Sequence, residues 1–424
     1  MNLRRLNYIL IPRSTERFDA LAHSRLGRRL QNLFALTPEG QLLAVATLVS
    51  AAAGIDVRFS HLYLVFCGLF GLLVAAAACR PFARIRHLEL RVEHPPRVAV
   101  GETITFTVVL HNRGPRPLWA LRVSGPFLPW DGTWTERRPG VARLAPGEEA
   151  RVVLRARFIE RGERWLGRFS AASVRPLGLM RGNLAFTDPV RVTVVPAIVA
   201  LHGPAAPPVP VPLAGARHAR GAGDSFELLG VRPYRQGDRI RDLHARSWAR
   251  LGEPMVREYR EARHRRVRVA LHAGMSRARR DDLDAAAGLA ASLVARAARG
   301  ETRVELVTLS AEPGEVTVGH DAAAFERALD LLAAAEPAPL PAAAAREAEA
   351  RIGAGLAPGE AVWLILADYT EAHAHLVAAL RDRLPALRPL LVTDDRAARR
   401  LAARDTLPTL RPAEIRDGLA LEAA

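Results

Sequence analysis

The sequence predicts three folded parts in succession: two N-terminal transmembrane helices, an antiparallel β-sandwich domain, and a doubly wound α/β domain. Three observations predict this order. Two long apolar segments lie near the N-terminus, hydrophobic residues alternate with period two in the middle region, and strand-like and helix-like segments alternate in the last region. At 424 residues, the chain is long enough for about two to four domains of ordinary size.

Composition excludes several classes of protein. Hydrophobic residues make up 49% of the chain and charged residues 25%, which excludes wholesale disorder and a collagen-like fibre. Two cysteines are too few for a disulfide-stapled secreted scaffold. The net charge is +16 and every basic residue is arginine, but these arginines are spread along the chain and aromatics are only 6%. We therefore expect no nucleic-acid partner, and attribute the excess charge near a membrane to attraction by anionic lipid.

Residues 39–80 predict a transmembrane helical hairpin, which follows a basic N-terminal segment, residues 1–38. The first apolar segment runs from Gly40 to Ile55, and the second carries no charged side chain from Phe59 to Cys79. A spanning helix needs about 20 residues, so the second segment is long enough and the first is marginal. The alternative is a helical hairpin buried in a soluble protein, although charge-free runs of this length are scarce there.

Arginine placement predicts the orientation of the hairpin. Seven arginines lie in residues 1–38 and four in residues 80–91, whereas the loop between the spans holds only Asp56 and Arg58. The positive-inside rule therefore places both termini and the large domains in the cytoplasm. About forty residues precede the first apolar segment, so we expect no secretory signal. The two cysteines, Cys67 and Cys79, are expected to be packing residues.

Residues 86–199 predict the β-sandwich domain, because hydrophobic residues alternate in short runs. The alternation is clean in residues 87–93 and holds with minor slips in 98–100, 104–110 and 150–158. Turn signals rich in proline and glycine separate the runs, which favours a sandwich of immunoglobulin-like size without a disulfide. Core packing rather than ligand stacking is expected for four tryptophans: Trp119, Trp130, Trp134 and Trp165.

Residues 200–222 predict a Pro/Gly-rich linker, since each proline fixes φ and removes a hydrogen-bond donor. The densest motif of the chain opens the next region, residues 223–424. Within this motif, Gly237 is expected to permit a positive φ in a turn, and Asp238 to cap a short helix that follows. Arg241 and Arg250 are candidates to pair with acidic groups such as Asp238 or Glu258.

This motif resembles the signature of the domain-of-unknown-function 58 family, bacterial membrane proteins whose genes commonly lie beside MoxR-type AAA+ ATPases. The family pattern is a phenylalanine, then Arg-x-Tyr-x-x-Gly-Asp-x-x-Arg-x-Ile-His-Trp, then Ala-Arg. Leu243 replaces the isoleucine and Ala245 replaces the tryptophan, with Trp248 nearby. The matching positions are Phe226, Arg232, Tyr234, Gly237, Asp238, Arg241, His244, Ala249 and Arg250. The motif is interpreted as a docking or switch surface, or alternatively as a turn stabilised by arginine–carboxylate pairs.

The region from Arg266 onward alternates between strand-like and helix-like segments. Strands are expected at 266–271, 304–309, 362–367 and 389–393, and helices at 281–299, 322–335 and 373–384. Such alternation favours a mostly parallel, doubly wound sheet. Residues 337–358, rich in alanine and proline, are expected to form an exposed insertion.

The resemblance implies a von Willebrand factor A-like fold for this domain, a fold that often carries a metal-ion-dependent adhesion site, Asp-x-Ser-x-Ser, after its first strand. The corresponding positions here are Ala270, His272, Gly274 and Ser276, without a carboxylate at the strand end. Asp368, after a later strand, is the candidate surviving acidic position, and one carboxylate seldom holds Mg²⁺. We therefore expect a degenerate adhesion site, with no bound metal and no cofactor.

Catalytic and zinc-binding patterns are weaker. His272, Asp368, His373 and His375 could form a zinc cluster, but their spacing is poor and solvated surface histidines are the expected alternative. The absence of lysine excludes a P-loop, and neither a Gly-x-Ser-x-Gly elbow nor a cytoplasmic cysteine supplies a nucleophile.

The resulting hypothesis is a non-enzymatic, membrane-anchored cytoplasmic protein-interaction module at the bacterial inner membrane. As the resemblance implies, it would act as an adaptor for a protein partner, a MoxR-type AAA+ ATPase, while the hairpin holds it in membrane lipid and raises its local concentration. Two alternatives remain open. One is a structural scaffold for envelope assembly, and the other is a hydrolase that uses the His244/Asp238 region or the strand-end histidines.

Overall fold

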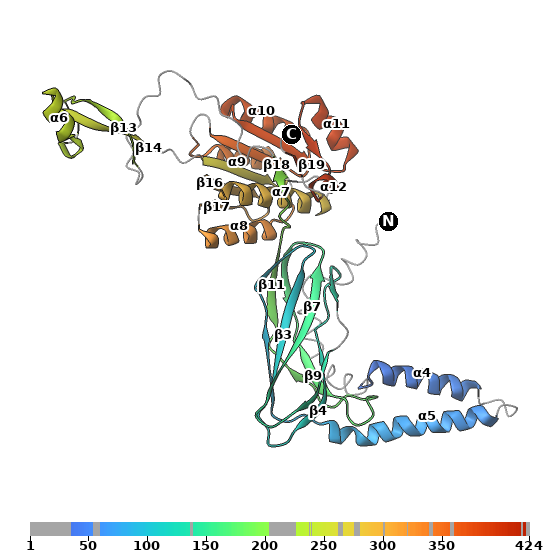
Figure 1. The fold of residues 1–424 in the computed structure, drawn as a ribbon. Helices are drawn as coiled ribbons and strands as arrows, with labels where there is room; N and C mark the ends of the chain where they lie inside the picture. The colour runs from blue at the N-terminus through green and yellow to red at the C-terminus, as the bar shows by residue number, and fades with distance from the viewer. Residues whose placement is uncertain are drawn as a thin grey trace. The chain divides into compact units, whose positions relative to one another are not determined.

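The computed structural model has a mixed α/β architecture with several antiparallel sheets, which confirms the predicted mixed α/β class (Figure 1). It describes residues 35–53, 60–135, 139–202, 226–236, 238, 240–261, 266–274, 280–299, 302–319, 321–338, 342–356, 360–416 and 419–420. The chain divides into two compact units. Unit 1 extends to Ile198 and includes Leu329–Ala335, and unit 2 comprises Val199–Ala328 and the residues from Glu336 onward.

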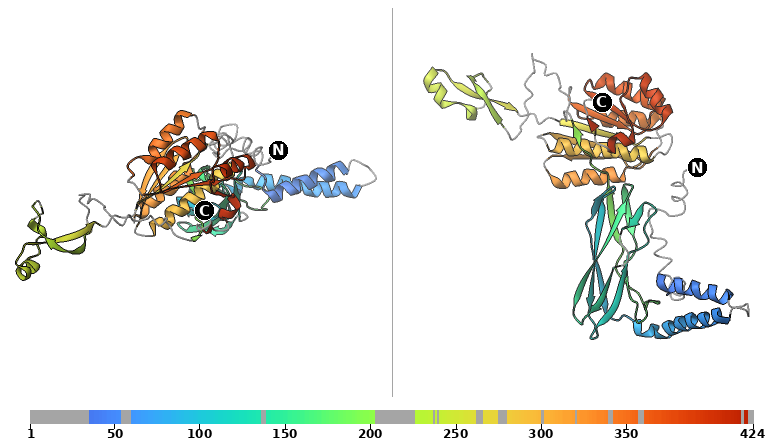
Figure 2. Two further views of the ribbon diagram at one scale, coloured as in Figure 1. Left: turned by 90° about the horizontal axis from the view of Figure 1, so that it is seen from above. Right: turned by 45° about the vertical axis from the view of Figure 1, so that its right-hand side comes forward.

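Unit 1 begins with two apolar helices, α4 (Pro38–Ala53) and α5 (Ser60–Cys79), which lie side by side (Figures 1 and 2). In the described part of the chain, one helix, His61–Ala83 with mean hydropathy 2.4, is long and apolar enough to cross a membrane by length and composition. With 16 residues, α4 is shorter, so the two-span hairpin stays a prediction. Cys67 is exposed in the chain as it stands, and Cys79 is half-buried.

The ends of both helices are held by one segment of the β region, residues 178–183. Thr37 precedes α4, and its Oγ1 donates to the carbonyl oxygen of Gly178 at 2.7 Å, while its backbone N donates to Leu179 O at 2.9 Å. Beyond α5, the Ile85 N donates to Asn183 Oδ1 at 2.6 Å, and Asn183 Nδ2 donates back to Ile85 O at 2.9 Å. The helical hairpin is therefore hydrogen-bonded to the β region at both of its ends.

The β region of unit 1 contains three sheets. The first is antiparallel, in the order β1 (Leu88–Glu93), β3 (Thr103–Asn112), β7 (Glu149–Phe158), β5 (Gly132–Trp134). The second is antiparallel, in the order β10 (Ala185–Phe186), β9 (Ser170–Ser173), β4 (Leu118–Ser124), β6 (Gly140–Leu144). In the third, β11 (Val190–Val195) pairs parallel with β2 (Arg97–Ala99) and antiparallel with β8 (Gly162–Leu166).

Strands from all three sheets contribute to one hydrophobic core. The period-two pattern of β3 explains its share, since alternate side chains point to one face: Ile104, Phe106, Val108 and Leu110 are all buried. Phe106 contacts the rings of Phe169 and Trp134 in this core.

The core prediction is wrong for one of the four tryptophans. The Trp119 side chain is 39% exposed, and the guanidinium groups of Arg143 and Arg175 lie 5.1 and 5.7 Å from its ring centre. An indole covered by cations on a strand surface is stabilised without entering the core.

Unit 2 is built around a six-stranded sheet in the order β17-β16-β15-β18-β19-β20. The strands are β15 (Arg266–His272), β16 (Arg303–Leu309), β17 (Gly314–Val318), β18 (Ala361–Leu366), β19 (Leu387–Val392) and β20 (Thr409–Leu410). Only β17 runs antiparallel to its neighbour. The strand order reverses between β15 and β18, and such a reversal opens a crevice beyond the carboxyl ends of the two strands.

Helices lie on both faces of this sheet (Figure 1). On one face, α9 (Ala342–Gly353), α10 (Glu371–Arg383) and α11 (Arg396–Arg404) share a hydrophobic core with the strands. The other face carries α7 (Arg280–Ala298) and α12 (Pro412–Arg416), and α8 (Ala322–Ala334) follows β17 in the chain. Helices between parallel strands are the connections that such a sheet requires.

Two segments differ from the sequence prediction. Residues 337–358 were expected to be an exposed insertion, but they contain α9, whose Ala348 and Ile352 are buried four residues apart on one helix face. An alanine-rich helix needs few large side chains to be covered, so its packing leaves little trace in the sequence. The expected linker begins as β12 (Leu201–His202), which pairs with β21 (Leu419–Ala420), and residues 203–222 lie outside the described residues.

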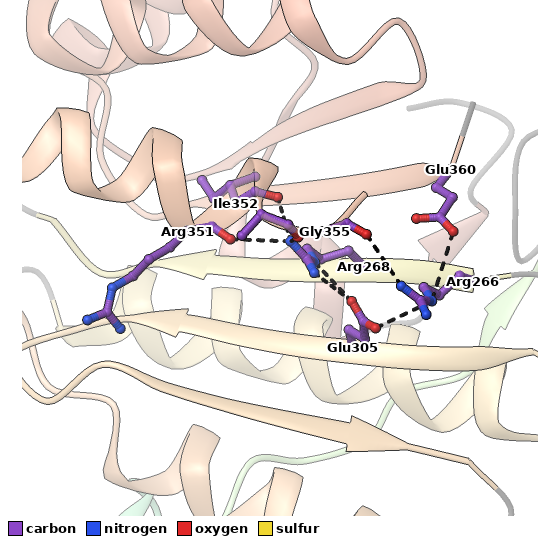
Figure 3. Close-up of polar contacts among 8 residues, drawn as sticks. Arg266, Arg268, Glu305, Arg351, Ile352, Gly355 and Glu360 are labelled. Carbon is purple, nitrogen blue, oxygen red and sulfur yellow. Dashed lines mark hydrogen bonds and ion pairs between the residues drawn. The ribbon is translucent and has the colours of Figure 1, made fainter. Parts of the chain in front are cut away.

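A buried ion pair links the amino-terminal halves of two central strands (Figure 3). The Arg268 Nη2 on β15 lies 2.6 Å from Glu305 Oε2 on β16, and both side chains are nearly inaccessible to solvent. Arg268 Nη1 also donates to the carbonyl oxygens of Arg351, Ile352 and Ala354 at the end of α9. One guanidinium thus neutralises a buried carboxylate and caps a helix C-terminus.

Candidate functional site

The carboxyl ends of the central strands of unit 2 bring several polar side chains together, and we call this cluster the strand-tip site. His272 ends β15, Asp368 follows β18 by two residues, and His373 lies in the first turn of α10. The site also contains Gly274 and Thr370, from the loops after β15 and before α10. Parallel strands end on the same edge of a sheet, which is why residues a hundred positions apart in sequence meet here.

Two buried imidazoles form the centre of the strand-tip site. The rings of His272 and His373 lie edge to face, with centroids 5.1 Å apart. The Gly274 N donates to His272 Nδ1 at 3.1 Å, and the Thr370 N donates to His373 Nδ1 at 3.2 Å. Both Nδ1 atoms therefore accept, so each ring carries its proton on Nε2, and His373 Nε2 donates to Gly274 O at 3.1 Å.

Burial keeps both imidazoles uncharged. Desolvation, with a smaller contribution from the neighbouring His373, lowers the pKa of His272 to about 3. Desolvation also lowers the pKa of His373, although the Asp368 carboxylate and the Gly274 carbonyl oppose this shift. At neutral pH the space between the strand ends is therefore filled by a neutral, hydrogen-bonded aromatic pair.

The acidic groups near the strand ends are engaged in local contacts. Asp368 Oδ1 accepts from Tyr369 N at 2.8 Å, and Tyr369 Oη donates to Asp405 Oδ2 at 2.7 Å. Burial raises the pKa of the Tyr369 hydroxyl above its usual range. On α7, Asp282 Oδ2 accepts from Thr393 Oγ1 at 2.6 Å. In the part of the chain that the structure describes, no group of three or more histidine, cysteine, aspartate or glutamate side chains could hold a metal ion.

The structure places the predicted strand-tip residues unevenly. His272, Gly274 and Asp368 all surround His373, whereas Ala270 is fully buried in the core between the sheet and α9–α11. Ser276 lies outside the described residues. The expectation of solvated histidines is wrong for His272 and His373, which are 3% and 1% exposed, because tertiary hydrogen bonds satisfy their nitrogens.

Sequence reasoning underestimated His373, and one local signal could have found it. Thr370 and His373 form a capping box at the start of α10, in which each side chain bonds the backbone of the other. A histidine at the third position of a helix that begins just after a buried strand is thereby directed towards the strand ends.

The family-signature residues form a second candidate surface, residues 226–261, which we call the signature hairpin. Its two strands, β13 (Phe226–Pro233) and β14 (Met255–Glu261), pair antiparallel. Between them lie a short 3₁₀ helix, η3 (Ile240–Asp242), and α6 (Ala245–Leu251). Gly237 lies outside the described residues.

An arginine–carboxylate pair stabilises the turn of the signature hairpin. Arg232 binds Asp238 through two hydrogen bonds of 2.7 and 2.8 Å, and Asp238 also accepts from Arg235 N at 2.8 Å. The Arg232 guanidinium, followed by the Arg235 amide, lowers the pKa of Asp238 to about 2. The expected helix cap by Asp238, and its expected pairing with Arg241 or Arg250, are therefore wrong, since the Arg232 fork occupies the carboxylate.

His244 connects the helical part of the signature hairpin to its second strand. Its backbone N donates to Met255 O at 2.8 Å, and its Nδ1 accepts from Ser247 N at 3.3 Å at the start of α6. These contacts give His244 a positioning role. Phe226 and Tyr234 lie at the beginning and just beyond the end of β13, and the Tyr234 side chain is 39% exposed.

The signature hairpin presents large apolar side chains together with arginines. None of the seven residues of α6 is buried, and the exposed apolar side chains are Ile240, Trp248 and Leu251. Arg241, Arg246, Ala249 and Arg250 are exposed beside them. Among the described residues, no carboxylate pairs with Arg241, Arg246 or Arg250. We call Ile240, Arg241, Arg246, Trp248, Arg250 and Leu251 the signature surface.

Comparison with known proteins identifies one family. The family described as "Protein of unknown function DUF58" matches residues 230–388, and this match supports the domain-of-unknown-function 58 family for the chain. The matched range contains both the signature surface and the strand-tip site. No curated protein matches the chain.

Solved structures show only remote similarity. The native conformation of the Escherichia coli alpha-2-macroglobulin is 18% identical over 27% of this chain and 7% of its own, with a TM-score of 0.20. The Salmonella alpha-2-macroglobulin reacted with methylamine is 18% identical over the same shares, with a TM-score of 0.21. The CARDB domain of PF1109 from Pyrococcus furiosus is 16% identical over 26% of this chain and 94% of its own, with a TM-score of 0.18. These scores carry no argument about fold or function.

Proposed function

We propose that the chain is a membrane-anchored cytoplasmic protein-interaction module, an adaptor that works with a MoxR-type AAA+ ATPase at the bacterial inner membrane. In this proposal α4 and α5 are two membrane spans, both termini are cytoplasmic, and unit 2 contains a von Willebrand factor A-like domain. The module is non-enzymatic and engages its partner through side-chain surfaces rather than through a bridging cation.

The observation that carries the proposal is the filled strand-tip site. An adhesion site of the metal-dependent kind needs carboxylate and hydroxyl oxygens around an open position, because Mg²⁺ demands oxygen ligands in near-octahedral geometry. Here β15 ends in His272 instead of a carboxylate, and the neutral His272–His373 pair occupies the space between the strand ends. A partner must therefore be bound by other surfaces.

The signature surface supports protein binding as the alternative. Exposed tryptophan and arginine side chains are the residues most enriched at the energetic centres of protein interfaces. Trp248 is 43% exposed and Ile240 is 77% exposed, next to arginines that no described carboxylate neutralises. A partner surface with an apolar centre and an acidic rim would match this chemistry.

The test is a pull-down of a purified MoxR-type ATPase from the same genome by the full-length protein in nanodiscs, in nucleotide-free buffer with EDTA. Binding is expected with the chelator present. The double substitution Arg246→Glu/Arg250→Glu on α6 is expected to abolish it, because it reverses the charge of the signature surface.

The matched control is Arg396→Glu/Arg400→Glu, which makes the same charge change at the same spacing on α11. This control is expected to bind like the wild type. Loss of wild-type binding on chelation, or equal behaviour of the two double variants, would contradict the proposal.

A further inference from the structure

A groove opens in the β region of unit 1 at the base of the helical hairpin, with a volume of ≈ 1370 Å³. We propose that this groove binds an acyl chain of an anionic phospholipid, which enters it from the bilayer alongside α4. The inference rests on the proposed membrane anchoring and adds a lipid-binding site to it.

The groove combines an apolar lining with a wall that belongs to the hairpin. Leu36, Pro38 and Gln41, at and just before the first turn of α4, line one side. The β region supplies the other side, chiefly with Phe127, Leu128, Trp130, Trp134 and Leu154. Ligand sites of this kind are concave and mostly apolar, with a small number of polar groups that fix orientation.

The position of α4 connects the groove to the bilayer. Leu42 and Leu48, on the helix whose first turn lines the groove, are each 73% exposed in the chain as it stands. If α4 spans the membrane, these side chains face lipid tails, and the groove begins where the hydrocarbon layer ends. The hydrogen bonds of Thr37 to Gly178 and Leu179 hold the two walls of the groove together at this level.

Exposed apolar side chains surround the base of the hairpin. Phe82 directly follows α5 and is 81% exposed, Phe127 in the groove lining is 59% exposed, and Leu177, next to the segment that holds both helix ends, is 45% exposed. Exposed apolar groups that gather in one region mark an interaction surface. Phenylalanines beside a spanning helix are stabilised by the membrane interface rather than by water.

Charged side chains in the groove favour an anionic lipid. Two arginines, Arg122 and Arg181, line it together with one glutamate, Glu39, so the lining carries one net positive charge. Arg122 Nη1 binds Glu39 Oε2 at 2.9 Å, which places a guanidinium at the start of α4. Guanidinium groups bind phosphate oxygens strongly, so the headgroup phosphate would lie beside these arginines.

The test uses the tryptophans of the groove as reporters. The full-length protein is reconstituted in nanodiscs containing phosphatidylglycerol brominated on its acyl chains, and tryptophan fluorescence is compared with that in unbrominated nanodiscs. Bromine quenches only at short range, so we expect Trp134→Phe to remove a large part of the quenching. Trp165→Phe, outside the groove lining, is the matched control and is expected to leave the quenching unchanged. Trp130→Phe is the second groove variant if Trp134→Phe does not fold.

Flotation of the same protein with liposomes separates this inference from the anchoring on which it rests. Flotation together with quenching that depends on the groove tryptophans supports both. Flotation with equal quenching in the groove and control variants overturns the lipid site and leaves the anchoring intact. Failure to float overturns both. Equal quenching by brominated phosphatidylcholine would overturn the preference for an anionic headgroup.

Discussion

The imidazole rings of His272 and His373 pack edge to face between the ends of β15 and α10, with their centroids 5.1 Å apart. Backbone amides bind both Nδ1 atoms, and His373 Nε2 is bound to a backbone carbonyl. Neither ring has its Nδ1 lone pair available for a cation, and neither carries charge at neutral pH. The strand-tip site therefore acts as a structural plug between the strand ends.

The depressed pKa of His272 predicts loss of stability in mild acid. The folded-state pKa is about 3, below the ordinary value of 6.5, so the unfolded chain binds more protons over this range. The stabilisation is fully present above pH 6.5 and declines as the pH falls towards 3. Between pH 7 and pH 5, His272 alone accounts for a loss of about 2 kcal/mol in the free energy of unfolding.

Urea denaturation of the full-length protein in detergent at a series of pH values measures this slope. His272→Asn keeps an acceptor for the Gly274 amide but cannot titrate, so it is expected to lower stability at pH 7 and to flatten the slope below pH 6.5. His375→Asn, at an exposed position on the same helix as His373, is the control and should retain the wild-type slope. An unchanged slope in His272→Asn would contradict the buried, neutral imidazole.

The Arg268–Glu305 pair predicts a large cost when one partner is removed (Figure 3). Arg268→Met leaves the Glu305 carboxylate buried without its counter-ion and the end of α9 without its cap, so the free energy of unfolding should fall by about 3–5 kcal/mol. The double variant Arg268→Met/Glu305→Leu should recover part of this loss, because no buried charge remains.

Chemical denaturation measures both variants against a surface control. Glu347→Ala breaks the exposed Glu347–Arg351 pair on α9 and is expected to cost about 0.5 kcal/mol or less. A loss for Arg268→Met as small as that of the control would show that the pair does not stabilise the sheet.

The junction between the hairpin and the β region predicts sensitivity at Gly182. A Cβ atom there would overlap the carbonyl oxygen of Ala83, just beyond α5, so backbone would have to move. Gly182→Ala is therefore expected to destabilise the protein by about 1–3 kcal/mol, measured by the thermal unfolding midpoint. Gly319→Ala meets no atom within 4 Å and is the control. Equal midpoints for the two variants would contradict the close contact.

Periodicity predicted the strands well where a single face decides burial. The run 104–110 is β3 (Thr103–Asn112), and the run 362–367 is β18 (Ala361–Leu366). In β3, alternation follows from one buried face, and in β18 the continuous apolar run follows from helices on both faces. Such patterns are local, so the sequence alone contains them.

The contacts of the candidate sites depend on tertiary structure and could not be derived in the same way. The partner of Asp238 is Arg232 rather than Arg241 or Arg250, because the turn of the signature hairpin brings the strand end back to the carboxylate. His272 and His373 lie 101 positions apart, and only the parallel arrangement of β15 and β18 places them in contact. The sequence pointed to the correct regions but not to the side-chain pairs within them.

The measurement that tests the central claim most directly is a titration of the full-length protein with Mn²⁺ or Mg²⁺ by calorimetry, beside an Asp368→Ala variant. The account predicts no saturable binding at the strand-tip site and identical curves for the two proteins. One saturable site in the wild type that disappears in Asp368→Ala would show that the strand tip holds a cation, and would contradict the account.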